Sequence, residues 1–301
     1  DLHIEAHSFP TRRSSDYVQV AFFEARPGLT GLWDLIKAQA ARDFPGVPRV
    51  VVGVNGHINY GAAFLLDRFD QAPVFGLPYS HAYYPDYFAE LQPRPLVSFR
   101  FPMDGIHNWV NGYGELKRMD GITLRFLDKK NLATDMEHFT RLNNACFQEH
   151  PFWADRDEAE DLELFRPFRH LLENENLVFA EHEGRPVAFY LWYPDFNRLV
   201  EGPRDLDLRD WLKLRFRTHI DTMRFTEVGV LPAYRNRPLS LAMIRATLPA
   251  VARARHEFTE GGFIFEDNRG SIALAKRILR RSFGCEAEPY RRYAVFEGEL
   301  K

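Results

Sequence analysis

The chain has 301 residues, of which 45% are hydrophobic and 27% charged, with a formal net charge of −3. This length favours two domains, and the small net charge gives no global electrostatic reason to expect a nucleic-acid or membrane partner. No apolar run approaches the roughly 20 residues of a membrane-spanning helix. Two distant cysteines, Cys146 and Cys285, form neither a disulfide framework nor a zinc site, so we expect a cytoplasmic protein.

The first sixteen residues differ from the rest of the chain. The stretch Leu2–Asp16 has neither helical nor strand periodicity and resembles translated sequencing-adapter sequence. A natural polar leader is the alternative. We leave residues 1–16 out of the fold prediction. If they are not native, the natural protein begins further upstream and its first domain is incomplete here.

The first half of the chain alternates strand and helix patterns. Strands are predicted at 17–25, 47–54 and 95–101, and helices at 32–44 and 62–69. This β-α-β-α-β order is typical of half of an α/β domain, so a partial N-terminal domain is predicted over 17–102. The following segment, 103–120, is rich in glycine and asparagine and is predicted to be a linker.

A complete second domain is predicted over 121–301. The hairpin turn Glu183-Gly184, the helix cap Asn268 and the helix-ending Gly284 are its clearest local signals. The predicted strands are 122–126, 177–182, 186–193, 224–230, 262–266 and 290–296, and the predicted helices are 132–147, 158–172, 239–255 and 268–281.

The order of these elements, and several segments, resemble the GNAT superfamily of N-acetyltransferases. Val228–Ile244 is similar to the strand–loop–helix that holds the coenzyme A pyrophosphate, and Phe263–Gly284 to strand five and helix four of that fold. Tyr193–Asn197, Asn55–Gly61 and 69–79 resemble a group of bacterial tandem GNAT-like proteins. The resemblance implies a mixed α/β GNAT fold, with one complete C-terminal copy preceded by a partial copy.

The resemblance also implies an acyl-CoA site. In GNAT enzymes the loop reads (Arg/Gln)-x-x-Gly-x-(Gly/Ala), and N–H groups at the helix start hold the phosphates. Here Pro238 replaces the first glycine and removes one N–H, which weakens binding by about tenfold to over a hundredfold. A helix start that binds nothing is the alternative. The expected cofactor-binding residues are Val228, Val230, Arg235, Arg237, Leu239, Ser240 and Asn268.

Amine acylation requires a base that removes a proton from the amine. Glu227 lies where some GNAT enzymes carry that base, and an ordinary strand glutamate is the alternative. The family's usual acid is a tyrosine about seven residues after the asparagine, but that position is Ala275 here. Tyr290 is the remaining candidate for an acid, although tyrosines in a closing strand usually pack in the core. We expect no metal site, because outside the leader no histidine pair has metal-ligand spacing.

Three functions are compatible with the sequence. The first is an N-acyltransferase that uses acetyl-CoA or another acyl-CoA and acts on a small-molecule amine or a peptide. The second is a non-catalytic GNAT-fold module that binds a ligand or a partner, suggested by Pro238 and Ala275. The third is a transferase that takes its acyl group from a charged tRNA. That enzyme would need a basic groove, which the pairs Arg280-Arg281 and Arg291-Arg292 do not establish.

Overall fold

The structure is a computed structural model that describes residues 17–112, 119–200, 202, 204, 206–216, 219–284 and 288–300. The predicted leader and Cys285 lie outside these residues. The strands are β1 (Tyr17–Val20), β2 (Arg49–Val52), β3 (Phe64–Leu65), β4 (Gln92–Pro102), β5 (Ile122–Phe126), β6 (Leu177–His182), β7 (Arg185–Pro194), β8 (Thr222–Val230), β9 (Phe258–Phe265) and β10 (Arg291–Glu299). The helices are α1 (Leu32–Asp43), α2 (Met103–Asn111), α3 (Leu132–Phe147), α4 (Glu158–Phe165), α5 (Leu208–Phe216), α6 (Leu239–Ala254) and α7 (Arg269–Phe283).

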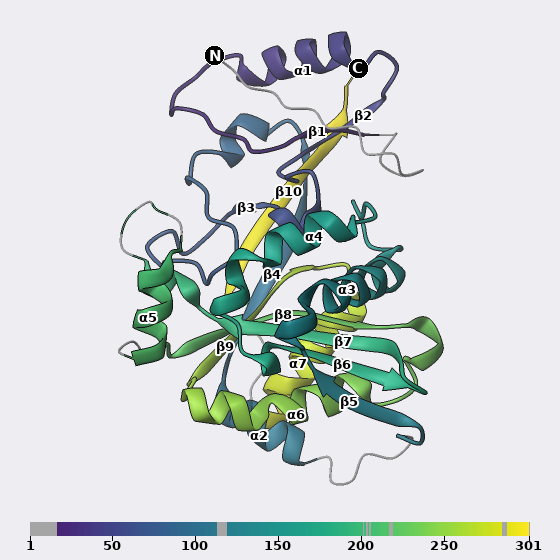
Figure 1. The fold of residues 1–301 in the computed structure, drawn as a ribbon. Coiled ribbons are helices and arrows are strands. Elements are labelled where there is room, and N and C mark those ends of the chain that lie inside the picture. Colours follow the sequence, from purple (N-terminus) through teal and green to yellow (C-terminus); the bar gives the residue numbers. More distant parts are fainter. Residues whose placement is uncertain are drawn as a thin grey trace.

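These strands form one mixed sheet with helices on both faces (Figure 1). The strand order is β1-β2-β10-β4-β9-β8-β7-β6-β5, and β3 pairs with β10. Side chains along β7 point alternately to the two faces of the sheet. Tyr190 and Trp192 pack with α6 on one face, whereas Phe189 and Leu191 pack against α3 on the other. Helices α2, α6 and α7 therefore cover one face, and α3 and α4 cover the other.

Strand β10 connects the two halves of the chain. Its first residues pair with β3 and β4, and its last residues pair with β2, from Phe296↔Val52 to Glu299↔Arg49. Strand β4, from the first half, lies between β9 and β10 of the second. Figure 1 shows β4 and β10 running together from the main body toward the part that carries β1, β2 and α1. The two halves thus share one continuous sheet.

The expected linker is wrong for residues 103–111, which form α2. The side chains of Met103, Ile106, Trp109 and Val110 are buried in the same core as α6 and α7, so this segment has a full apolar face. Residues 113–118 lie outside the described part of the chain.

Two further predictions are wrong. The expected helix at 62–69 is instead β3 and the turns around it, since Ala63 has a φ of 74° and Phe64 and Leu65 pair with β10. The expected helix at 158–172 ends at Phe165 and continues as a 3-10 turn, because Pro167 cannot donate a helical hydrogen bond. Helix α5 was not predicted.

Within the described ranges, no helix combines the length and the apolar character needed to cross a membrane.

Candidate functional site

The parallel strands β8 and β9 separate along their length. They pair from Thr222↔Phe258 to Phe225↔Gly261 and no further, although both strands continue beyond this point. Past Phe225 the edge of β8 that faces β9 therefore has no strand partner in the described part of the chain. Backbone N–H and C=O groups along such an edge can bind an extended ligand.

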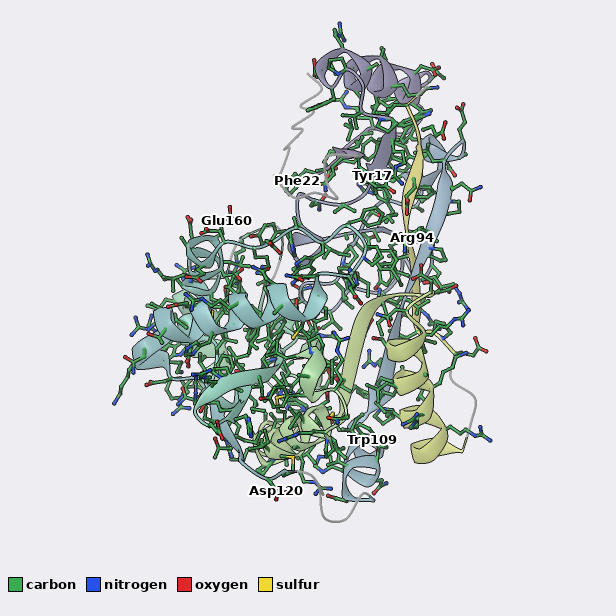
Figure 2. The ribbon with its side chains drawn as sticks, turned by 90° about the vertical axis from the view of Figure 1, so that its right-hand side faces the viewer. Tyr17, Phe22, Arg94, Trp109, Asp120 and Glu160 are labelled. Carbon is green, nitrogen blue, oxygen red and sulfur yellow. The ribbon has the colours of Figure 1, made fainter. Side chains whose placement is uncertain are left out.

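A cavity of about 620 Å³ lies at this opening and reaches both faces of the sheet. A closed apolar cavity of about 150 Å³ holds one benzene molecule, so this space can hold a chain of well over ten carbon atoms. Trp109 marks its α2 side, and Figure 2 shows that residue far from Glu160 on α4. The cavity wall is largely apolar and includes Phe99, Phe101, Leu248, Ala275 and Ile278 toward α2, α6 and α7, and Phe139, Phe147, Phe165 and Phe168 toward α3 and α4.

Glu227 is a half-buried carboxylate on the cavity wall. The Nδ2 group of Asn143, on α3, donates a hydrogen bond to its Oε2 at 2.5 Å. Burial raises the pKa of Glu227, and the charge of Arg156, the Asn143 hydrogen bond and the charge of Arg224 oppose that rise only in part. A carboxylate with a raised pKa is well suited to accept a proton near neutral pH. The structure thus places the predicted base candidate in the cavity.

A β-bulge in β8 determines which side chains share the wall. Leu191 of β7 pairs with Glu227, whereas the next residue, Trp192, pairs with Phe225, so Thr226 is an extra residue. In a regular strand, Glu227 would point to the same face as Phe225, toward α6. Because of the bulge, Glu227 points instead toward α3, on the same face as Arg224. Arg224 and Glu227, three residues apart on β8, therefore line the same face of the cavity.

The predicted coenzyme A loop lies at the end of β8, where α6 begins. Pro238 is the N-cap of α6 and makes no side-chain capping bond. The first N–H groups of a helix have no acceptor within that helix, so this end remains suited to an anion. Ser240 is half-buried in the first turn, and Leu239 is fully buried, so Leu239 can offer only its backbone.

The two predicted arginines of this loop bind backbone carbonyls. Arg235 donates to the carbonyl of Val230 at 3.3 Å and to that of Cys146 at 3.2 Å. Arg237 donates to the carbonyl of Asp120 at 3.1 Å. Both side chains attach the loop to neighbouring segments. A role in phosphate binding remains a prediction for each of them.

Only some of the remaining predicted residues line the cavity. Val228 and Asn268 line it, and the Asn268 side chain also caps α7 by accepting from the N–H of Ser271 at 3.1 Å. Tyr290 does not line it, since its hydroxyl donates to Gln71 at 2.7 Å outside the cavity wall. A role for Tyr290 as the acid remains a prediction. Val230 also lies outside the lining.

Sequence reasoning missed Asn143, Arg156 and Arg224, which line or support the cavity next to Glu227. Arg224 could have been noticed as one of two charged residues, with Glu227, in the strand segment TMRFTEVGV. Asn143 lies in the middle of an ordinary amphipathic helix and Arg156 in a loop, so neither gave a local signal.

No protein-family model matches the chain. Its sequence is 19% identical over 188 residues to a bacterial ceramide synthase from Caulobacter vibrioides, covering 60% of this chain and 47% of that protein. The chain thus spans about half the length of that curated relative.

Solved structures give a match over most of the chain. A tandem GNAT protein from the clavulanic acid biosynthesis pathway has a TM-score of 0.52 and 15% identity, covering 95% of this chain and 76% of that one. A GCN5-related N-acetyltransferase from Sphaerobacter thermophilus has a TM-score of 0.50 and 15% identity, covering 95% and 74%. The fold predicted from the sequence is confirmed: this chain has the mixed α/β fold of the GNAT acyltransferases.

Proposed function

We propose that the protein is an N-acyltransferase that moves an acyl group from coenzyme A to an amine. The observation that carries this proposal is the opening between β8 and β9, with Glu227 on its wall and the start of α6 at the end of β8. The GNAT fold and the distant likeness to a bacterial ceramide synthase support it.

The proposed reaction starts with an acceptor that arrives as an ammonium ion. Glu227 takes one proton from it, which leaves a nucleophilic amine beside the opening. The amine nitrogen attacks the thioester carbonyl, so a C–N bond forms and the C–S bond breaks. The departing thiolate takes the second proton, which the new amide nitrogen must lose. This route needs no separate tyrosine acid and is compatible with Ala275, a buried alanine on the cavity wall.

The donor would be held by the chain's own backbone. The free edge of β8 beyond Phe225 would bind the amides of the pantetheine arm, and the first turn of α6, with the Ser240 hydroxyl, would bind the phosphates. The apolar cavity between β4, α2, α6 and α7 would hold the acyl chain. Because an acetyl group would leave most of that space unfilled, a long-chain donor fits better than acetyl-CoA.

Titration calorimetry of the full chain with acetyl-CoA and with a series of longer acyl-CoAs tests the donor. Each buried CH₂ contributes about 0.8 kcal/mol, so two additional methylenes in the cavity should tighten binding about tenfold. Release of free coenzyme A thiol in the presence of a panel of amines tests the transfer. Absence of binding to any acyl-CoA at millimolar concentration would refute the proposal.

A non-catalytic ligand-binding module is the second candidate, and the proline at position 238 is the observation that favours it. This alternative predicts that acyl-CoA binds without thiol release in the presence of any amine.

A further inference from the structure

Arg224 is a buried arginine on the cavity wall with few partners. The residue is only 7% exposed, and its Nη1 donates to the carbonyl of Phe75 at 3.1 Å. Its Nε has no hydrogen-bond partner among the residues that the structure describes. The ring of Tyr193 lies 6.0 Å from the guanidinium carbon. One neutral carbonyl is therefore its only direct hydrogen-bond acceptor within the described ranges.

The carboxylates nearest to Arg224 in the fold have other partners. Glu260 is its register neighbour on β9, but its Oε1 accepts from Ser98 at 2.9 Å, on the far side from β8. Glu227 is close enough for its pKa to be affected by the charge of Arg224, and it is bonded to Asn143. The buried carboxylates on this face form ion pairs with other arginines: Glu260 with Arg291, Asp161 with Arg156, and Asp195 with Arg198.

The backbone is shaped around this guanidinium. Gly76 has a φ of +79°, and a Cβ at that position would overlap Arg224 Nη1 and lie 2.9 Å from the Tyr193 hydroxyl. Burying a charge without a counter-ion is costly, and a buried charge normally has a partner. Arg224 forms no ion pair with any described residue, so a closely fitted cation of this kind on a cavity wall points to an anion supplied by a ligand. The hydroxyls of Thr226 and Thr259 also line this cavity, have no hydrogen-bond partner among the residues that the structure describes, and add further polar groups.

We propose that the acceptor is an amino acid or a similar amine with an anionic group, and that Arg224 binds that group. This rests on the proposed function, because it assigns the acceptor amine to Glu227. The two residues are three apart on β8, which limits their Cα separation to about 10 Å, and the bulge turns both toward the same space. One unpaired cation and one carboxylate on a single wall complement a zwitterion.

The anion in question is not the coenzyme A pyrophosphate. The predicted phosphate-binding end of α6 follows Val230, which lies six residues beyond Arg224, or about 20 Å along an extended strand. Arg224 is thus at the opposite end of β8 from the helix start. An anion here belongs to the acceptor.

Calorimetric titration without any acyl donor tests this inference on the full chain. Phenylalanine is compared with 2-phenylethylamine, leucine with isopentylamine, and phosphoethanolamine with ethanolamine, which separates carboxylate from phosphate recognition. In each pair of compounds, we expect the one without the anionic group to bind at least about tenfold more weakly. Arg224→Met should remove that difference and Arg224→Lys should reduce it. Arg253→Met, at an exposed arginine paired with Glu175, is the control that should leave it unchanged.

Equal binding of each pair to the wild-type chain would overturn the inference, even if Arg224→Met does not fold. Failure of the proposed function has a different signature: amino acids bind through Arg224 while no acyl-CoA binds and no thiol is released. Conversely, thiol release at equal rates with charged and uncharged members of each pair would support acyl transfer and refute the role of Arg224.

Discussion

Replacing Glu227 with glutamine tests both the chemistry and the cost of burying this side chain. Glutamine keeps the shape of the side chain. Its amide oxygen can still accept the hydrogen bond from Asn143 Nδ2, which lies 2.5 Å from Glu227 Oε2 in the wild-type chain. What is lost is the ability to take a proton from the acceptor. A positioned general base contributes about 10²- to 10⁴-fold to the rate, which corresponds to about 2.7–5.4 kcal/mol of transition-state stabilisation. Glu227→Gln should therefore lower kcat/KM by that factor.

The stability of this variant should change in the opposite direction. Burial raises the pKa of Glu227 in the folded chain above its unfolded value. The stability linked to such a group is fully present below the unfolded pKa and is lost as pH rises through the folded pKa. At pH 7–8 the wild type carries the cost of a half-buried carboxylate that glutamine avoids. Glu227→Gln should be more stable there, with the advantage shrinking as pH falls.

Thiol-release kinetics and urea unfolding between pH 4 and pH 8 measure the two effects. Glu257→Gln is the matched control, because that side chain is 65% exposed and should change neither quantity. Unchanged kcat/KM in Glu227→Gln would exclude this residue as the base. A loss of stability that is equal at every pH would show that Glu227 serves as a structural partner of Asn143.

Three other substitutions test separate parts of the structure. Pro238→Gly should restore an N–H at the start of α6 and tighten acyl-CoA binding by about tenfold to over a hundredfold in calorimetry; an unchanged Kd would show that this helix end does not bind phosphate. Gly229→Ala would push a Cβ into the ring of Phe189, which is fully buried, and should cost about 1–3 kcal/mol in urea unfolding. Gly270→Ala is the control and should not destabilise, because a Cβ there would meet only Asn268 Oδ1, at an ordinary contact distance of 3.8 Å. Asp161→Asn would leave the buried Arg156 without its ion-pair partner and should cost about 3–5 kcal/mol; a loss below about 1 kcal/mol would contradict that assignment.

Features with local causes could be predicted from the sequence. Asn268 caps α7 and Gly284 ends it in a left-handed conformation, as expected, and the segments β8 and α6 occur where periodicity places them. Periodicity could not distinguish a two-residue strand such as β3 from a short helix, because only pairing with the distant β10 decides between them. The position of β4 between β9 and β10 is also non-local and left no pattern in the sequence.

The candidate site was predictable only in part for a similar reason. Glu227 and Asn268 could be proposed from their places in the order of elements. Strict alternation along β8, however, would separate Glu227 from Arg224 by placing them on opposite faces. The bulge at Thr226 places both side chains on the same face instead. That bulge depends on how β7 and β8 pair, which the sequence does not reveal. The combination of a carboxylate and an unpaired arginine therefore became visible only in three dimensions.

The shared strand β10 has a consequence for the synthesis of the protein. Strands β2, β3 and β4 belong to residues 49–102, but each pairs with β10, which leaves the ribosome nearly 200 residues after β4. Until then their edges remain unpaired and open to association with other chains. Such long-range pairing slows folding, so the first half should depend on chaperones during translation more than a self-contained domain does. Deleting β10 should therefore convert a folded protein into an aggregating chain, which light scattering of the truncated and full chains would detect.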